Sequence, residues 1–544
     1  MIRLERPNAG EFDETIGLCP SREIVMFRLR GLVGIAVLPA LLLSCSSGGG
    51  SATSHSGPLT ARLFFAPAQL DPQACTEIGC RMLTAYAYDT PVAFRNGKIV
   101  PRLASTWDVS LTSIKLTIRP DVTCSDGSKL GAAEVADSVK RMIDPTTANT
   151  FVTASFGTNK GITATADTSA NTVTIEVPNP YGDLLYGMTN VQVVCRAGLK
   201  DPSQLKTKTF GSGQYVLNEF VNGDHYTYTK RNGYKWGPGG LNNEGSQWPS
   251  KITFKVIADE TTATNLFLSG GLDLTIAQGP DIQRLNSNSR VTFKKSATVD
   301  IYTIYINHSA GRPTADVNIR RLLWAGLNRS DFAKAIAPGA QAAQTFVVPG
   351  GQCYSPDKVS SAMIPFNVTQ AQQYAEQSGY QLQGGQLVKD GKQLAVTVLI
   401  ADTFGNAVGD YLTAGWGKVG VKVNAITEPA SQAVKTLVTP GGDWDMVIGG
   451  GGDYSPTILI KNFRNPGPPN FWKVNNASFN ALADQARVTP TQSACDLWNS
   501  AEQELYKAAD FLPFMLVQPT TYGHNLTFTP WLLTGVYPDT LHWT

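Results

Sequence analysis

The sequence predicts an α/β fold large enough for two lobes, on three observations. Apolar residues alternate with period two at 114–118, 173–177 and 252–256, as in half-buried strands. Stretches with helical apolar spacing lie between these segments. The chain has 544 residues, of which 42% are hydrophobic and 16% charged, so it can bury a substantial core. This composition excludes wholesale disorder and favours two large lobes.

Three stretches carry the helical pattern most clearly. In residues 132–143, Val135, Val139 and Met142 fall on one face. Residues 316–336 predict a helix capped by Asp316. Residues 491–509 carry an apolar stripe made of Ala494, Leu497, Trp498, Ala501 and Leu505. We expect these faces to pack in the core.

The charge balance narrows the function classes. Lys and Arg number 45 against 43 Asp and Glu, a net charge of +2. Such a balance argues against an electrostatic nucleic-acid binder. No run of 18 apolar residues predicts an ordinary transmembrane helix.

The N-terminal region predicts an exported lipoprotein. A basic segment at 26–30 precedes an apolar block at 31–43, the order found in a signal peptide. The residues LLSC at 42–45 resemble a bacterial lipobox, which predicts a signal peptide over 26–44 and a lipid on Cys45. Residues 45–57 then form a flexible tether rich in Ser and Gly. The expected location is the outer leaflet of the cytoplasmic membrane; the alternative is a secreted protein without the lipid.

Residues 1–25 do not fit a signal peptide. They contain acidic residues, among them Glu5, Glu11 and Asp13. We therefore expect translation to start at Met26, which makes residues 1–25 a mis-annotated extension that is not part of the protein.

The remaining cysteines suggest disulfides. Apart from Cys19 and Cys45 there are six: Cys75, Cys80, Cys124, Cys195, Cys353 and Cys495. An even number in an exported protein fits three disulfides, for which fifteen pairings exist. We favour Cys75 with Cys80 and Cys353 with Cys495, although the sequence does not choose. A metal site is the alternative, but CxxC and HxxxH spacings are absent.

Enzyme signatures are also absent. The sequence has no GxSxG, HExxH or Walker A motif, and its five histidines are scattered. We expect no catalytic residues, no cofactor and no bound metal.

A family resemblance follows from motifs spread over the chain. They include LDP at 70–72, YDTPV at 88–92, PRLASTW at 101–107, CSDG at 124–127, GSGQY at 211–215, RN at 231–232, DVNIR at 316–320, WGKVGV at 416–421, WD at 444–445 and DYSP at 453–456. In this order they resemble the family 5 extracellular solute-binding proteins, the dipeptide- and oligopeptide-binding components of ABC importers.

The resemblance implies a bilobal fold of the periplasmic-binding-protein type. Lobe I would comprise residues 58–298 with a return at 515–544, and lobe II residues 299–514. Two chain crossings would form the hinge, and ligand would shift the population toward the closed form. It also implies a monomer that delivers its solute to membrane permease subunits with cytoplasmic ATPases.

The resemblance also implies the ligand-binding residues. An aspartate matching Asp453, next to Tyr454, binds a peptide's ammonium in oligopeptide-binding relatives. Gly450, Gly451 and Gly452 precede it and would let a ligand approach the backbone. Thr76 and Glu77 match a lobe I segment that lines the cleft.

Two departures bear on specificity. Gly450 stands about where many relatives carry a tryptophan, which would widen the pocket. Residues 400–402, Ile-Ala-Asp, stand where dipeptide-specific relatives carry an arginine clamp. Longer peptides or a cationic ligand bound by Asp402 and Asp453 then become the expectation.

Other functions remain open. The same receptor would suit a non-peptide solute such as a cationic metabolite, a sugar compound, haem or a metal chelate. An extracellular peptide sensor and a secreted hydrolase are further alternatives.

Overall fold

The computed structural model describes residues 57–75, 78–277, 281–289, 291–296, 300–337, 340–404, 406–439, 441–464, 470–531 and 535–544. The predicted 1–25 extension, the signal peptide and Cys45 lie outside these residues, as does the tether up to residue 56. Within the described ranges, no helix has the length and apolar character needed to cross a membrane.

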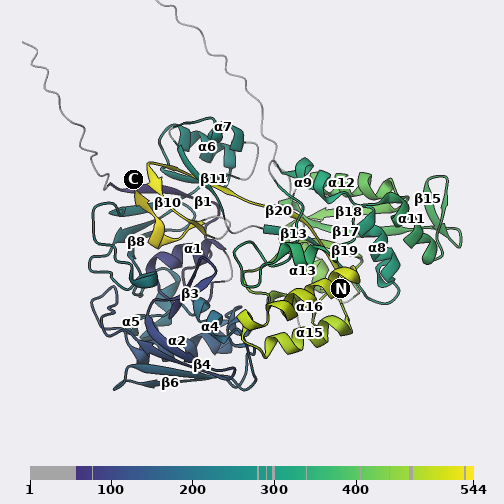
Figure 1. The fold of residues 1–544 in the computed structure, drawn as a ribbon. Coiled ribbons are helices and arrows are strands. Elements are labelled where there is room, and N and C mark those ends of the chain that lie inside the picture. Colours follow the sequence, from purple (N-terminus) through teal and green to yellow (C-terminus); the bar gives the residue numbers. More distant parts are fainter. Residues whose placement is uncertain are drawn as a thin grey trace, which may run out of the picture. The chain divides into compact units, whose positions relative to one another are not determined.

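A seven-stranded mixed sheet organises the N-terminal part of the chain (Figure 1). In spatial order its strands are β12 (Val291–Lys295), β21 (Thr520–His524), β11 (Leu274–Ala277), β1 (Leu59–Leu63), β10 (Lys251–Val256), β9 (His225–Lys230) and β8 (Tyr215–Val221). The central strands β1 and β10 are parallel. The strand predicted at 252–256 is therefore confirmed as β10, and β21 joins this sheet from the far end of the chain.

A four-stranded antiparallel sheet lies next in the chain. Its order is β4 (Ala104–Val109), β5 (Ser113–Ile118), β7 (Thr172–Glu176) and β6 (Thr163–Asp167). Helix α2 (Ala132–Ile143) packs on β6 and β7. The strands predicted at 114–118 and 173–177 and the helix predicted at 132–143 are confirmed, and the apolar face of α2 is buried.

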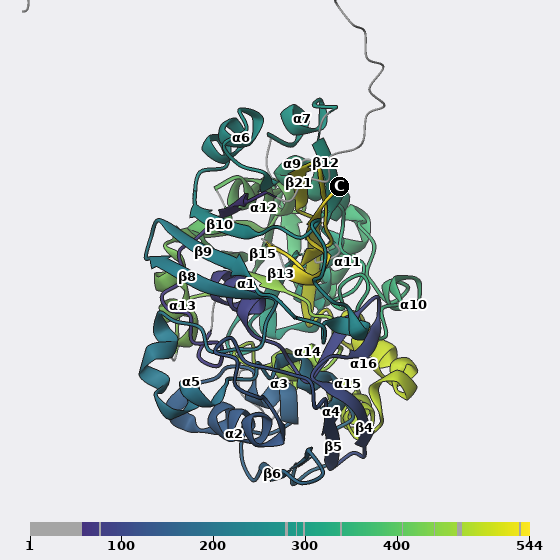
Figure 2. The same ribbon diagram turned by 90° about the vertical axis from the view of Figure 1, so that its left-hand side faces the viewer.

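Shorter elements connect these two sheets. They are α1 (Ile78–Ala87), β2 (Val92–Arg95), β3 (Lys98–Pro101), α3 (Val152–Phe156), α4 (Leu184–Gly187), α5 (Arg196–Lys200), α6 (Glu260–Leu268), α7 (Asp281–Asn286), β22 (Leu526–Thr527), β23 (Pro530–Trp531), β24 (Gly535–Val536) and β25 (His542–Trp543). Figures 1 and 2 both place α6 and α7 at one end of this region and α2 with β6 at the other.

A five-stranded sheet organises the rest of the chain. Its order is β18 (Lys422–Glu428), β17 (Ala395–Ala401), β19 (Met446–Gly451), β13 (Asp300–Ile306) and β20 (Phe511–Val517). Around it lie α8 (Val317–Ala325), α9 (Arg329–Ile336), α10 (Pro356–Ser360), α11 (Val368–Gln377), α12 (Asn406–Gly417), α13 (Ala430–Val438), α14 (Ile458–Phe463), α15 (Ala477–Arg487), α16 (Cys495–Lys507) and the small sheet of β14 (Gln381–Gln383), β15 (Gln386–Lys389) and β16 (Lys392–Gln393).

The single helix predicted over 316–336 is wrong in one respect, because the segment forms two helices. Asp316 caps α8 as expected, accepting a hydrogen bond from the amide of Asn318. The helix then ends at Gly326, and the side chain of Asn328 accepts from the amide of Asp331 to begin α9. A glycine followed by an Asn cap ends one helix and starts another.

The helix predicted over 491–509 is shorter than expected. A 3-10 turn occupies Thr491–Ser493, and α16 follows as Cys495–Lys507. The predicted stripe faces the core: Trp498, Ala501 and Leu505 are fully buried.

The apolar side chains gather into separate cores. Three clusters use residues from Leu59 to Leu285 and from Tyr522 to Trp543, and another uses residues 301–517. We call the described residues of 57–296 and 520–544 the first lobe, and those of 300–517 the second lobe. Both belong to one compact unit, residues 54–544.

Candidate ligand-binding site

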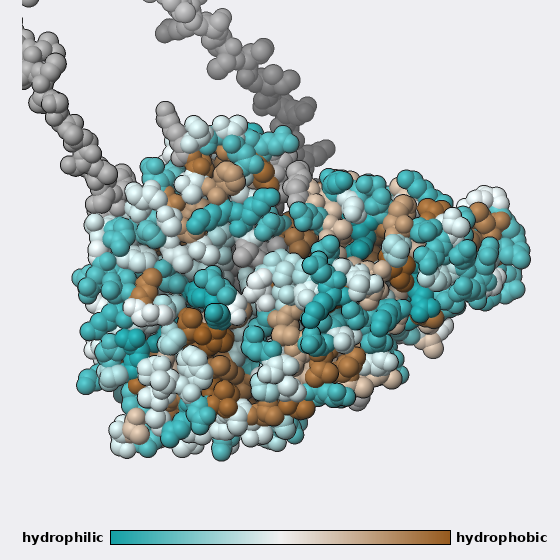
Figure 3. Space-filling view, viewed as in Figure 1, coloured by the Kyte–Doolittle hydropathy of each residue, from teal (hydrophilic) through white to brown (hydrophobic). Residues whose placement is uncertain are grey.

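A cavity of about 630 Å³ is lined by residues of both lobes. The first lobe contributes Pro72, Cys75, Arg81, Ala85, Tyr88, Phe94, Arg95, Arg102, the 149–157 segment, Tyr181, Tyr186, Gln192 and Tyr537 among others; the second contributes Val348 and parts of the 452–464 segment with Arg487. Figure 3 shows hydrophobic surface gathered over α4 and toward α15, whereas the surface around α11 and β15 is mostly hydrophilic.

The first-lobe wall is aromatic. The ring centroids of Phe94 and Tyr186 lie 5.3 Å apart in an edge-to-face arrangement. Phe94 also meets Tyr454 of the second lobe edge-to-face, with 5.8 Å between centroids. The guanidinium of Arg81, on helix α1, lies 4.2 Å from the centre of the Phe151 ring. Such a wall favours flat or apolar ligand groups.

Two first-lobe arginines that line the cavity are paired. Arg95 forms an ion pair with Asp539 at 2.6 Å, and Arg102 pairs with Asp89 at 2.5 Å. Asp89 is fully buried and also accepts hydrogen bonds from Tyr234 (3.0 Å) and Trp236 (2.9 Å). These arginines are therefore neutralised by the protein itself.

The second-lobe wall begins where β19 ends. Gly452 has a φ of 87°, and a Cβ there would lie 2.9 Å from the Phe346 carbonyl oxygen, so this turn needs glycine. The turn presents Asp453 to the cavity. The main chain fixes this residue, because the Val348 amide donates to its carbonyl at 3.1 Å and its carboxylate accepts from the Ser455 amide at 3.3 Å.

Asp453 is an exposed residue whose carboxyl group lies at the cavity surface. Its surface faces the cavity, and desolvation raises its pKa above the ordinary value. The Ser455 amide and the positive charges of Arg81 and Lys461 oppose that shift. An ionised carboxylate in such a place is a natural partner for a cationic ligand group.

The lobes contact each other beside the cavity through Asp183. This first-lobe residue is 2% exposed and accepts hydrogen bonds from three second-lobe side chains: Ser455, Thr491 at 3.0 Å and Gln352 at 3.2 Å. Desolvation raises the pKa of Asp183, and these donors lower it. A buried carboxylate with several donors but no bonded cation ties the lobes together only while they are in contact.

Gly182 brings the backbones together at the same place. Its amide donates to the Arg487 carbonyl at 2.6 Å, and a Cβ at this position would lie 1.9 Å from the carbonyl oxygen of Thr489. Only a residue without a side chain fits this approach.

The predicted site residues are only partly brought together. Asp453, Tyr454 and Gly452 line the cavity. Gly450 and Gly451 instead lie in β19, where they pair with β13, so they do not line it. Packing inside the lobe accounts for the glycine at 451, because a Cβ there would lie 2.5 Å from the Phe346 ring.

The remaining candidates lie elsewhere. Asp402 is exposed in a 3-10 turn, Asp402–Phe404, and does not line the cavity. Thr76 and Glu77 lie outside the described residues, although the preceding Cys75 lines the cavity.

Sequence reasoning missed Arg81, Phe94, Gly182 and Asp183. The chain around each looks ordinary, and each acquires its role through a partner distant in sequence. Asp183, for example, is 272 residues away from Ser455. The only available signal was the position of Arg81 directly after Cys80.

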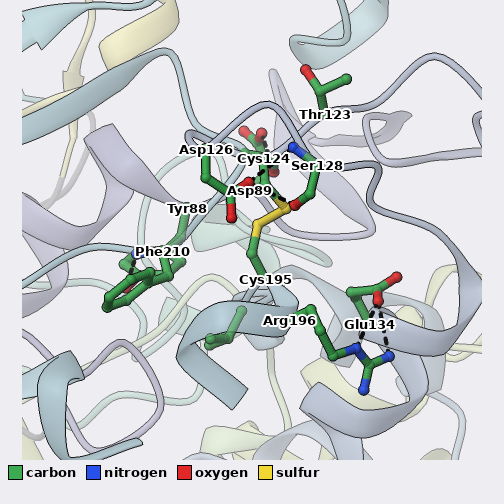
Figure 4. The surroundings of a disulfide bond; sticks show 12 residues. Tyr88, Asp89, Thr123, Cys124, Asp126, Ser128, Glu134, Cys195, Arg196 and Phe210 are labelled. Atoms are coloured by element: carbon green, nitrogen blue, oxygen red, sulfur yellow. Dashed lines mark hydrogen bonds and ion pairs between the residues drawn. A yellow bond between two sulfur atoms is a disulfide. The ribbon is translucent and has the colours of Figure 1, made fainter. Parts of the chain in front are cut away.

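Three disulfides are formed: Cys75–Cys80, Cys124–Cys195 and Cys353–Cys495. The two pairs that we favoured are confirmed. Figure 4 shows the third, in which Cys195 precedes α5 and joins Cys124 near Asp126 and Ser128.

Comparisons with known proteins agree with this architecture. A family model described as bacterial extracellular solute-binding proteins, family 5 middle, matches residues 98–463. The dipeptide-binding protein of Lactococcus lactis is 25% identical, over 88% of this chain and 90% of its own. Haem-binding protein A of Haemophilus influenzae is 20% identical, over 81% and 82%.

A solved structure supports the same family and fold. The substrate binding protein from Microbacterium hydrocarbonoxydans, complexed with 4-hydroxybenzoate hydrazide, has a TM-score of 0.70 and 26% identity. The alignment covers 90% of this chain and 100% of that one. The predicted family and the α/β fold of the periplasmic-binding-protein type are thereby confirmed, and the family is not enzymatic. The chain belongs to family 5 of the bacterial extracellular solute-binding proteins, which capture a small solute outside the cytoplasm for an ABC transporter.

Proposed function

We propose that this receptor captures short peptides, oligopeptides rather than dipeptides alone, for import. The observation that carries the proposal is the Asp453 carboxylate, which lines the cavity beside the contact between the lobes. A peptide's ammonium group is the kind of charge that such a carboxylate holds.

The energetics favour this ligand class. An unpaired charge in a closed cavity costs several kcal/mol, and a carboxylate offsets that cost for an ammonium. The cavity, of about 630 Å³, is in the range that holds drug-sized molecules, which includes short peptides. The relative named as a dipeptide-binding protein supports the same class.

Native mass spectrometry tests the ligand class directly. A chain that starts after Cys45 should be purified gently from cells grown in peptide-rich medium, because a ligand well above its dissociation constant stays bound. We expect a ladder of adduct masses that fits mixed short peptides. A single non-peptide mass would contradict the proposal.

Titration calorimetry then tests the role of Asp453. Adducts recovered by denaturation would be sequenced, and a synthetic copy titrated with and without an N-terminal acetyl group. Acetylation removes the charge and should weaken binding strongly. Equal affinity for both forms would contradict the role assigned to Asp453.

A second candidate ligand is an uncharged aromatic acyl hydrazide or a related aromatic compound. The aromatic first-lobe wall, with Phe94 and Tyr186 edge-to-face, favours it. So does the relative of 26% identity whose structure holds 4-hydroxybenzoate hydrazide. Saturable binding of that compound, with no competition by peptides, would make this candidate the better one.

We further propose that Cys45 carries the lipid anchor and that the receptor acts as a monomer at the outer face of the cytoplasmic membrane. The lipobox-like residues 42–45 support the anchor. Metabolic labelling with a fatty acid should mark the wild-type chain and leave Cys45→Ala unmarked. Labelling of both chains would contradict this site.

A further inference from the structure

The charged side chains that line the cavity are not all satisfied by the protein. Three of its arginines have carboxylate partners within 2.7 Å: Arg95 with Asp539, Arg102 with Asp89, and Arg464 with Asp484. Among the described residues, neither Arg81 nor Arg487 has a hydrogen bond or ion pair with a carboxylate; Arg487 lies at the contact between the lobes, where its carbonyl accepts from the Gly182 amide. The paired arginines belong to the wall itself, whereas Arg81 is available to a ligand.

Arg81 is partly buried in the cavity wall. Desolvation lowers its pKa below the ordinary value, and only the negative charge of Asp453, followed by Tyr186, opposes the shift. Its guanidinium packs 4.2 Å from the ring centre of Phe151. A partly buried guanidinium with no carboxylate hydrogen-bonded to it can pair with a carboxylate of a ligand.

Two contacts define the position of Arg81, one to its side chain and one to the backbone beside it. The Phe151 ring supports one face of the guanidinium. The Cys75–Cys80 disulfide ends at the residue directly before Arg81, and Cys75 itself lines the cavity. The disulfide thus holds the backbone of α1 next to Arg81 at the cavity wall, and a planar guanidinium there can bind a carboxylate at two points.

We propose that Arg81 binds the carboxylate of the ligand, so that the site selects zwitterions with a cationic group on Asp453 and an anionic group on Arg81. This inference rests on the proposed function, because it takes the ligand to be a peptide with free ends. The ligand's carboxylate then binds to the first lobe and its cationic group to the second, so a zwitterion bridges the two lobes. At residues 400–402 the chain lacks the arginine that dipeptide-specific relatives use for this group.

Binding of one peptide in three chemical forms tests the inference. A peptide identified by mass spectrometry is prepared with free ends, with a C-terminal amide, and with an N-terminal acetyl group. Each form is titrated into the wild-type chain and into Arg81→Gln, Arg81→Lys and the control Arg119→Gln. Arg119 forms a partly exposed ion pair with Asp121 and does not line the cavity.

In the wild-type chain, amidation should weaken binding on the order of 10- to 100-fold, the range of a charged hydrogen-bonded pair. Arg81→Gln should bind the free-ended peptide more weakly than the wild-type chain does, by a similar factor. It should bind the free acid and the C-terminal amide with equal affinity. Arg81→Lys should keep part of the preference for the acid, and Arg119→Gln should behave as wild type.

The outcomes separate the two proposals. Equal binding of acid and amide by the wild-type chain overturns the role of Arg81 while leaving peptide capture intact, and so does an unchanged preference in Arg81→Gln. That first comparison needs no variant, so a folding defect in Arg81→Gln does not obscure it. If the wild-type chain binds none of the three forms, peptide capture fails and this inference fails with it.

Discussion

The two walls of the cavity differ in breadth and in chemistry. The first-lobe wall draws on α1, β2, the 149–157 segment and residues near 537, and it carries most of the aromatic rings. The second-lobe wall comes mainly from one short stretch after β19, with Asp453 at its start.

This difference separates two tasks. The first lobe presents a broad surface whose charges are largely paired internally, which suits the choice of ligand shape. The second lobe adds a carboxylate and the donors that reach Asp183, which suits the retention of ligand once the lobes meet. Changes at Asp453 in the second wall should therefore act on affinity for ligands with an ammonium group, changes at the contact between the lobes on affinity for all ligands, and changes in the first wall on preference for the rest of the ligand.

The largest expected effect is on the second wall. Asp453→Asn keeps the shape but removes the charge, and should cost about 2–5 kcal/mol of affinity for a peptide with a free N-terminus. The N-acetylated form should lose far less. Calorimetry on both forms measures the difference, and equal losses for the two would contradict an ammonium contact.

The second largest effect is expected from a change at the contact between the lobes. In Gly182→Ala the new Cβ would lie 1.9 Å from the Thr489 carbonyl oxygen, so the lobes must separate slightly. We expect a loss of about 1–3 kcal/mol in affinity for free-ended, amidated and acetylated peptides alike. Gly417→Ala is the control, because open space surrounds that position. A loss confined to one peptide form would refute a role in closure.

The stability of the second lobe should depend on pH through Glu502. This buried carboxyl group accepts a hydrogen bond from the Phe346 amide at 2.6 Å, and burial raises its pKa to about 7. Between the unfolded pKa and about 7 the folded chain binds more protons, so stability falls as pH rises, by up to ~1.4 kcal/mol per pH unit.

Glu502→Gln should remove this slope. Thermal unfolding at several values between pH 5 and 8 measures it, with Glu504→Gln on the same helix as the control. Asp510, whose pKa burial raises to about 6, contributes in the same direction and remains in both variants. An identical pH slope in Glu502→Gln and wild type would show that Glu502 titrates normally.

The smallest expected effect comes from an aromatic pair that joins the two walls. Phe94 and Tyr454 meet edge-to-face across the lobes, at 5.8 Å. A double-mutant cycle with Phe94→Leu and Tyr454→Leu should give a coupling of about 0.5–1.5 kcal/mol in ligand affinity. Additive losses would place the two rings in separate roles.

Local patterns predicted much of the fold. The alternation at 114–118 and the apolar face of 132–143 match β5 and α2, since a period of two or 3.6 is set by neighbouring residues. The division of 316–336 into two helices was not predicted, although the sequence contains the signals for it: Gly326 is an ordinary helix stop and Asn328 an ordinary helix start.

The candidate site was less accessible to sequence reasoning. Asp453 could be identified from a motif, but Arg81 and Asp183 depend on partners brought near by the folding of two lobes. Gly450 and Gly451, which the sequence suggested as ligand contacts, have a structural role in the pairing of β19 with β13, and this role could not be read from the sequence.

The disulfides have a consequence for export. Their order is sequential: each cysteine is joined to the next one along the chain, within one lobe. A chain that emerges from the membrane N-terminus first exposes the two members of each pair before any cysteine of the next pair. Oxidation in order of emergence therefore produces the native bonds without reshuffling, and none of these three bonds joins one lobe to the other.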